Sequence, residues 1–457
     1  MPDKQIQAWI GAHWDEILDD LRKFLRQPSV SAQKWGVAEM AHICADMLKQ
    51  YGVNARIVPF GHFVDFVFGE KAAKGLNGAK TLLIYNHYDV QPVEPLDLWT
   101  SPPFEPTIRD GKIFARGVCD DKGEIIVRLA AIRCYQKLFG PLPVNLKWLI
   151  EGEEEIGSPG VMPFVRNNAG LLNADYCIWE SGGVDYDGRP DLTMGCKGIL
   201  YIELACRTAG RDLHSANAAV VPSPVWRLLQ ALATLKDKNE RILIDGFYNG
   251  IRKPTQADLA AVRAEPSTEQ QFKKAAGIKA FFKNLKRFEF RKQLYFQPTC
   301  NIAGIWSGYT GPGGKTVLPC EARCKIDFRL VPDMDPDDIL RKLKKHLKKK
   351  GYGDIEVLDI EHGEHPARTP IDHPFVSLVK RACEKTHGKK AILSLTTAGT
   401  GPMYPFAKYL RVPIVSIGSS YPDAGAHAPD EHWRLNDIKT GIEQIVNVFR
   451  ELAVQQP

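Results

Sequence analysis

Four short, densely apolar runs constrain the fold of this chain more than any other feature of its sequence. Stretches with helical periodicity separate these runs, which are Thr81–Tyr85, Val144–Ile150, Tyr176–Trp179 and Pro413–Ile417. Apolar runs of this length are typical of strands that are buried on both faces, as in a parallel sheet covered by helices. The sequence therefore predicts an α/β fold with a mostly parallel sheet.

Two helices are expected before the first apolar run. Gln5–Phe24 carries isoleucine and leucine at helical spacing and is predicted to be one helix. Val37–Tyr51 is predicted to be the second, because Gly52 then stands at a position suited to a helix C-cap.

The middle of the chain follows a different pattern. Its predicted strands and helices are, in chain order, Leu200–Cys206, the helix Pro224–Leu235, Asn301–Trp306, Ala322–Leu330, the helix Pro336–Lys350, and Asp354–Ile360. This β-α-β-β-α-β order is that of a ferredoxin-like unit. We therefore predict a larger α/β domain at 1–196 and 367–457, interrupted by a smaller ferredoxin-like α+β domain at 197–366. The Lys-rich stretch 236–297 is not assigned.

Composition and charge exclude several classes of protein. With 457 residues, 44% of them hydrophobic and 25% charged, the chain is neither collagen-like nor wholly disordered. No run approaches the roughly 18 apolar residues of a membrane span, and the polar N-terminus shows no secretory leader. The ten cysteines form no Cys-x-x-Cys pair, which favours free thiols in a reducing compartment such as the cytoplasm.

Each apolar run ends in residues that are able to bind a metal. His87 and Asp89 follow the first run, Glu151–Glu155 the second and Glu180 the third, and the fourth leads through a Gly/Ser loop to His427. In open α/β sheets, ligands bind beyond the carboxyl ends of the strands, so these segments are expected to converge. Imidazoles and carboxylates bind divalent metals, and zinc is favoured where two imidazoles contribute.

Taken singly, each motif has a simpler explanation. A His-x-Asp pair occurs by chance, Asp120 is placed to cap the helix that follows it, and His427 is a loop histidine with Glu431 as a partner. The glutamate run is harder to explain in this way, because clustered carboxylates after a buried strand need a cation or a shared proton. In the chemical interpretation, His87 binds a metal, and Asp89 accepts a hydrogen bond from the other ring nitrogen of His87. Asp120 is then a carboxylate that bridges two cations.

Four motifs together resemble one family in order and spacing. The motifs are Tyr85–Pro92, Arg116–Gly123, Glu151–Ser158 and Gly425–His427. They resemble the di-zinc peptidases and deacylases that include carnosinase-type dipeptidases, glutamate carboxypeptidase, acetylornithine deacetylase and succinyl-diaminopimelate desuccinylase. The resemblance spans nearly the whole chain. It implies that the larger domain is catalytic and that the inserted domain is a lid through which two copies form a homodimer.

The resemblance also implies roles for individual residues. In two sets that share one carboxylate, the ligands would be His87, Asp120 and Glu180 for one zinc ion, and Asp120, Glu155 and His427 for the other. Mn²⁺ or Co²⁺ are alternatives to zinc. Glu154 would be the general base for a water that bridges the two ions, and Asp89 the carboxylate behind His87.

Further residues resemble the substrate-binding parts of the family. His214 matches a lid histidine that reaches across the dimer to the neighbouring active site, where it stabilises an oxyanion. Thr316 and Arg329 match the carnosinase branch, in which Arg329 would bind the substrate carboxylate with two hydrogen bonds. Gly399 and Thr400 lie in the matching substrate loop. Without the resemblance, Thr316 indicates a turn and Arg329 a salt bridge on a strand.

The sequence thus predicts a cytoplasmic, homodimeric two-zinc hydrolase of amide bonds next to a free carboxylate, namely a dipeptidase or related exopeptidase acting on small peptides. Two departures from the carnosinase pattern favour an alternative, an N-acyl amino acid deacylase: Glu180 replaces Asp, and Thr397 starts the substrate loop in place of a charged residue. A rival of another class is a nucleic-acid or partner-binding protein that uses the basic stretches Lys273–Lys292 and Arg341–Lys350. Leucines at helical spacing make the second stretch a helix with a solvated face, so we expect neither nucleic acid nor membrane as a partner.

Overall fold

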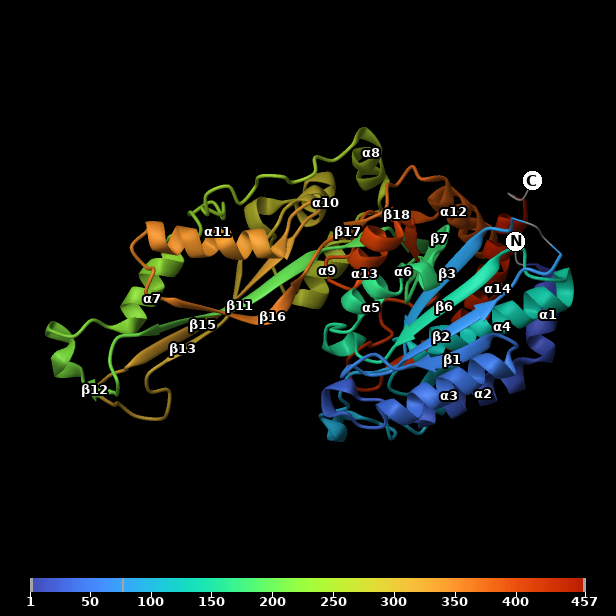
Figure 1. The fold of residues 1–457 in the computed structure, drawn as a ribbon, viewed down its shortest axis with the longest axis horizontal. Coiled ribbons are helices and arrows are strands. Elements are labelled where there is room, and N and C mark those ends of the chain that lie inside the picture. Colours follow the sequence, from blue (N-terminus) through green and yellow to red (C-terminus); the bar gives the residue numbers. More distant parts are fainter. Residues whose placement is uncertain (1–2, 76–77, 455–457) are drawn as a thin grey trace.

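The computed structural model describes residues 3–75 and 78–454. Its main sheet has the strand order β1-β2-β6-β3-β7-β19-β9-β18, and β8 pairs with β9. Figure 1 labels β1, β2, β6, β3, β7 and β18 of this sheet. These strands are β1 (Asn54–Val58), β2 (Phe66–Lys71), β3 (Thr81–His87), β6 (Asn145–Glu151), β7 (Tyr176–Trp179), β8 (Gly183–Val184), β9 (Pro190–Thr193), β18 (Ile392–Ser394) and β19 (Ile414–Ser416).

The centre of this sheet is parallel, as the sequence predicts. The four apolar runs form β6, β3, β7 and β19, which pair with one another in parallel. The sheet as a whole is mixed, because β1 and β2 are antiparallel to their neighbours, and β9 is antiparallel to β19. Every residue of β3 after the first is buried, which explains why so short a run is so uniformly apolar.

Helices cover both faces of the main sheet. Alternate side chains of β3 enter two different cores, Leu82 and Ile84 on one face and Leu83 and Tyr85 on the other. The helices of the first core include α1 (Lys4–Ala12), α2 (Trp14–Arg26), α3 (Val37–Gln50), α4 (Lys122–Phe139), α12 (Pro374–His387) and α14 (Leu435–Val454). The second core is covered by α5 (Val161–Asn167), α6 (Ala169–Leu172) and α13 (Met403–Pro405). No helix in the described part of the chain is long and apolar enough to cross a membrane.

The prediction of a single helix over Gln5–Phe24 is wrong. The chain forms α1 and α2 there, with His13 between them. The backbone N–H of His13 ends α1 by donating to the carbonyls of Trp9 and Ile10, and the His13 ring stacks on Trp9. Apolar residues keep their helical spacing on both sides of this break, so periodicity alone does not reveal it. The helix predicted at Val37–Tyr51 is α3.

The inserted segment forms a second sheet with its own core. Its strand order is β13-β15-β11-β16, with all pairs antiparallel, and α7 and α11 pack against it. The elements are β11 (Gly198–Arg207), α7 (Pro224–Ala233), β13 (Asn301–Ser307), β15 (Glu321–Leu330), α11 (Pro336–Lys349) and β16 (Glu356–Glu364). The predicted ferredoxin-like element order is therefore present. We refer to this unit as the lid; it extends away from the main sheet and from both termini (Figure 1).

The chain enters and leaves the lid side by side. Gly195–Cys196 (β10) pairs with Ala367–Arg368 (β17) immediately before and after the insertion. The domain limits at 196/197 and 366/367 stay a prediction.

Much of the unassigned stretch packs on the α/β unit rather than on the lid. It forms α8 (Gln256–Ala264), α9 (Glu269–Ala276) and α10 (Arg287–Phe296). Val262 and Tyr295 are buried in the core of the main sheet, and Asp258 forms a buried ion pair with Arg368 at 3.2 Å. These helices therefore link the lid segment of the sequence to the main domain.

Candidate metal centre

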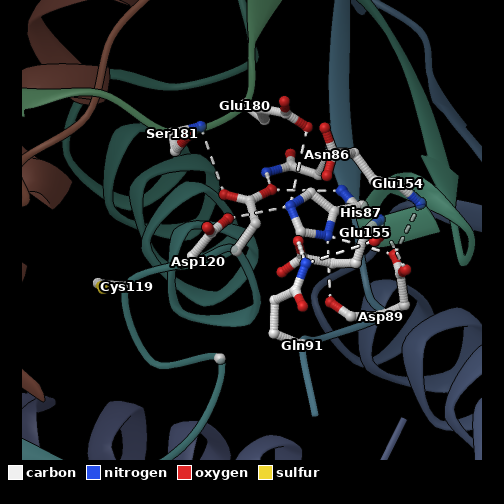
Figure 2. Close-up of polar contacts among 12 residues, drawn as sticks. Asn86, His87, Asp89, Gln91, Cys119, Asp120, Glu154, Glu155, Glu180 and Ser181 are labelled. Atoms are coloured by element: carbon white, nitrogen blue, oxygen red, sulfur yellow. Dashed lines mark hydrogen bonds and ion pairs between the residues drawn. The ribbon is translucent and has the colours of Figure 1, made fainter. Parts of the chain in front are cut away.

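The carboxyl ends of three adjacent strands bring the predicted ligands together. His87 is the last residue of β3, and Glu180 directly follows β7. The turn Glu154–Ile156 follows β6, which pairs with β3 on the side opposite β7. Asp120 precedes α4, and His427 comes from the loop before β20 (His432–Arg434). Figure 2 shows the side chains of Asp120, Glu155 and Glu180 gathered around His87.

Asp120 lies between two histidines. Its Oδ1 is 3.1 Å from Nε2 of His87, and its Oδ2 is 3.0 Å from Nε2 of His427. The same nitrogen of His427 is 3.3 Å from Oε2 of Glu155, and Nε2 of His87 is 3.9 Å from Oε2 of Glu180. The five side chains are thus joined through His87 and the Asp120 carboxylate, and the donor atoms of His87, Asp120 and Glu155 lie within 4.8 Å of one another.

The donor atoms fit divalent metal ions. Glu180 is buried, and while its Oε1 accepts a hydrogen bond from the indole of Trp179, its Oε2 has no hydrogen-bond partner among the described residues. Burial raises the pKa of Glu180 well above its usual value, and burial together with the charge of Asp120 raises the pKa of Glu155 to about 7. Buried carboxylates that face two imidazoles are stabilised by a cation, and these nitrogen and oxygen donors suit zinc.

Asp121 also lies within reach of His87 and Glu180, but its oxygens are already in use. Its Oδ2 accepts hydrogen bonds from Nδ2 of Asn86 at 2.5 Å and from the backbone N–H of His87 at 3.3 Å. Its Oδ1 accepts from the backbone N–H of Ser181 at 3.4 Å. Asp121 therefore holds the ends of β3 and β7 together, whereas Asp120 faces the imidazoles.

Asp89 joins the histidine to the glutamate turn. Its buried carboxylate lies 3.3 Å from Nδ1 of His87, on the side of the ring away from Asp120. The same carboxylate accepts the backbone N–H groups of Glu154 at 3.1 Å and Glu155 at 3.0 Å (Figure 2). Gln91, which the sequence analysis does not single out, donates to Oε2 of Glu155 at 2.9 Å.

Glu431 does not have the partner that the sequence suggests. Its buried carboxylate accepts from the guanidinium of Arg116 at 2.9 Å and from the backbone N–H groups of Gly117 and Cys119. Glu431 thus fixes the segment that leads to Asp120, and the expectation that it serves His427 as a hydrogen-bond partner is wrong.

Sequence reasoning also missed a buried arginine beneath the ligands. Arg128 of α4 donates from Nη1 to Oδ1 of Asn86 at 2.5 Å and to the carbonyl of Tyr85 at 3.1 Å, and from Nη2 to the carbonyl of Trp179 at 2.7 Å. Tyr85 and Trp179 stand near the ends of β3 and β7, so this one guanidinium ties both strand ends together. The available signal was a single charged residue in an otherwise apolar part of a helix.

Arg128→Met is expected to lower the free energy of unfolding by about 3 kcal/mol or more, because it removes a buried charged donor from the side chain of Asn86 and from the carbonyls of Tyr85 and Trp179. Urea unfolding of the metal-free protein measures the change. Arg133→Met on the same helix is the control, since Arg133 pairs with Glu16 at the surface and its loss should cost about 1 kcal/mol or less. Equal effects of the two substitutions would contradict the role given to Arg128.

The residues predicted to bind substrate fall into two groups. Arg329 of β15 donates from Nη1 to Oγ1 of Thr400 at 2.6 Å, and the carbonyl of the adjacent Gly399 accepts from the backbone N–H of Lys197 at 3.0 Å. His214 and Thr316 lie elsewhere. His214 is the last residue of β12 (Leu213–His214), which pairs with β14 (Val317–Leu318), and Thr316 directly precedes β14. Figure 1 places β12 at the far end of the lid, away from β3, β6 and β7, so one chain does not bring His214 to its own metal ligands.

Comparison with known proteins agrees with this arrangement. The model of peptidase family M20/M25/M40 matches residues 83–451. The Cys-Gly metallodipeptidase dug1 of Schizosaccharomyces pombe is 28% identical over 97% of this chain and 97% of its own length. The human Beta-Ala-His dipeptidase is 25% identical over 98% of this chain and 92% of its own.

A solved structure supports the same assignment. The M20 family metallo-carboxypeptidase Sso-CP2 from Sulfolobus solfataricus is 36% identical and superimposes with a TM-score of 0.89 over 96% of this chain and 99% of that one. Family model, relatives and structure all extend over both the main sheet and the lid. The chain therefore belongs to peptidase family M20/M25/M40 and is a hydrolytic enzyme, a metallopeptidase.

Proposed function

We propose that the chain is a dipeptidase or related exopeptidase that hydrolyses the amide bond next to a free carboxylate. The observation that carries this proposal is the position of Asp120, with one oxygen facing His87 and the other facing His427. That position suits two metal ions that share one carboxylate. Relatives named as dipeptidases and a structure named as a carboxypeptidase support the substrate class, because both kinds of enzyme release a residue with a free carboxylate.

Two zinc ions are proposed as the metals, with Mn²⁺ or Co²⁺ as alternatives. The two sets of ligands are His87, Asp120 and Glu180, and Asp120, Glu155 and His427. When bound, the two ions would lower the pKa of a water and polarise the substrate carbonyl.

Glu154 is the proposed general base. It stands beside the ligand Glu155 in the turn after β6, and Asp89 fixes its backbone N–H. Glu154 takes a proton from the attacking water and then passes it to the leaving amine. Asp89 acts through His87, whose ring it orients from the side opposite Asp120.

Arg329 is the proposed binding group for the substrate carboxylate. Its guanidinium is oriented by Thr400 and has further N–H groups that can bind a carboxylate with two hydrogen bonds. Arg329 comes from the lid and the loop with Gly399 and Thr400 from the main domain. Substrate would therefore bind between the two domains.

A second copy of the chain is proposed to supply His214 and Thr316. The lid presents apolar side chains that suit such a contact: β13 is an edge strand with Ile305 and Trp306 exposed, and Trp226 of α7 is 67% exposed. Clustered apolar surface and an uncovered strand edge are typical of interfaces. His214 of the second copy would then stabilise the oxyanion of the reacting carbonyl.

Trp226→Glu is expected to convert a dimer into monomers, because the new charge would be buried in the contact. Light scattering after size-exclusion chromatography measures the mass, and activity should fall with it if His214 serves the other copy. Phe139→Glu places the same change on α4 of the main domain and is the control. A monomeric variant with full activity would contradict the proposed role of His214.

A cytoplasmic location is also proposed. All ten cysteines are free thiols, and nine of them are buried. Free thiols persist in a reducing compartment.

Amide hydrolysis by the zinc-loaded enzyme tests the function. The substrates are free dipeptides and the same carboxyl-terminal residues with N-acetyl or N-succinyl groups in place of the first residue. Faster cleavage of free dipeptides would support a dipeptidase. Faster cleavage of the capped compounds would support the N-acyl amino acid deacylase instead, which the relatives named above do not favour. Failure of every substrate with both metals bound would contradict the proposal.

A further inference from the structure

A small cavity lies between the main domain and the strand by which the chain leaves the lid. Its volume is about 140 Å³, several times the roughly 30 Å³ that one water occupies in the liquid. The walls include Ser158, Pro159, Met162, His365, Pro402 and Tyr404. We call it the Met162 pocket. It is too small for a whole dipeptide and suits one side chain.

Two walls of the Met162 pocket continue the segments that carry the proposed catalytic and binding groups. Gly157 and Ser158 directly follow the turn with Glu154, and Ser158 is tied to the end of β6 by a hydrogen bond from its Oγ to Glu151 at 2.8 Å. On the other side, Gly401 directly follows Thr400, which accepts the hydrogen bond from Arg329. Two lining segments of the pocket thus adjoin, along the chain, the proposed base and the partner of Arg329, which favours a position next to the bound substrate.

The chemistry of the walls favours an apolar side chain. Met162 and the prolines supply apolar surface, and Tyr404 stacks on His365 with ring centroids 4.1 Å apart and planes at 14°. This stack makes a flat wall between the main domain and the segment that leaves the lid. Glu364 adds a carboxylate on the lid side.

We propose that the Met162 pocket receives the side chain of the substrate residue that carries the free carboxylate, and that it selects a neutral apolar side chain of about the size of leucine or methionine. This inference rests on the proposed function, because it assumes that Arg329 holds that residue. Met162 is then a residue that determines specificity, with no part in the chemistry.

A substrate series tests the proposal in the zinc-loaded, full-length enzyme. Free Ala-X dipeptides with X = Gly, Leu or Glu are compared by kcat/KM. The natural enzyme is expected to prefer Leu over Gly by at least about 10-fold, since filling an apolar pocket gives a discrimination of this order, and to cleave Glu least. Cleavage of the Gly compound tests the proposed function itself and does not require the pocket.

Met162→Trp fills the pocket and Met162→Ala enlarges it. Met162→Trp is expected to lower kcat/KM for the Leu compound and so to abolish the preference for Leu over Gly. Met162→Ala is expected to shift the preference from Leu to Phe. Arg166→Trp, which places the same ring on the exposed side of α5, is the matched control and should change neither ratio.

Three results would overturn the proposal. The first is an equal loss for the Gly and Leu compounds in Met162→Trp together with an unchanged Leu to Phe ratio in Met162→Ala. The second is an effect of the Met162 substitutions that depends on the first residue of the dipeptide instead of the second, measured with Leu-Gly against Ala-Gly. The third is a natural enzyme that cleaves the Gly and Leu compounds equally well. If no compound is cleaved at all, the proposed function fails and this inference falls with it.

Discussion

Glu154→Ala is expected to bind both metal ions and yet lose about 10³-fold or more in kcat. Glu154 stands next to the proposed ligand Glu155 but is not itself among the ligands, so its removal leaves both sets of donor atoms intact. What is lost is the group that moves the proton from the attacking water to the leaving amine, and general acid–base catalysis is typically worth about 10²–10⁴-fold. Metal content measured by mass spectrometry and steady-state kinetics on the same preparation check both parts.

Glu153→Ala is the matched control for this experiment. Glu153 belongs to the same run of glutamates and precedes Glu154 in the turn, but no contact ties its side chain to His87 or Asp120 among the described residues. Its substitution should leave kcat within about 10-fold. The proposed role of Glu154 would be refuted by a metal-replete Glu154→Ala enzyme whose turnover resembles that of Glu153→Ala.

The parts of the fold that the sequence predicts are those that burial controls. A strand with neighbours on both sides and helices on both faces must be apolar throughout, and so β3, β6, β7 and β19 stand out as dense apolar runs. The polar residues that follow β3, β6 and β7 also stand out, because a polar group at such a place needs a partner. His87 and Glu180 come at the carboxyl ends of predicted strands. Because ligands bind beyond these ends in an open α/β sheet, the sequence alone predicts that the two residues lie close together.

The rest depends on contacts that leave little trace in the sequence. The apolar residues of α1 and α2 keep one helical spacing across the break at His13, so the pattern does not reveal the break. The antiparallel pairing of β1, β2 and β9 depends on which edge of the sheet each strand joins. α8 and α10 follow the lid segments in sequence but bury Val262 and Tyr295 in the other core, a choice made by tertiary packing. Glu431 pairs with Arg116, and Arg128 binds carbonyls, through contacts between residues far apart in the sequence.

The distinction between Asp120 and Asp121 shows the same limit in the site itself. Two adjacent aspartates are equivalent in composition, and both approach His87. They differ in what surrounds their oxygens: two imidazoles for Asp120, and the amide groups of Asn86, His87 and Ser181 for Asp121. Both oxygens of Asp121 accept N–H groups of the protein, which leaves neither of them free for a cation, and this is why Asp120 is proposed as the shared ligand.

Asp120→Asn and Asp121→Asn turn this assignment into a measurement. Asp120→Asn is expected to weaken metal binding at both sites by at least about 10³-fold, because a unit charge about 4 Å from a divalent cation is worth about 8 kcal/mol at an effective dielectric constant of 20, and the amide oxygen of the asparagine replaces only part of that interaction. Asp121→Asn keeps an oxygen that can accept from Asn86 and should weaken metal binding by about 10- to 100-fold, the usual cost of changing a residue that supports the ligands without binding the metal. Titration against a chromogenic chelator gives both affinities. The larger loss in Asp121→Asn would show that Asp121 is the ligand, and the loss of one metal only in Asp120→Asn would show that no carboxylate is shared between the two sites.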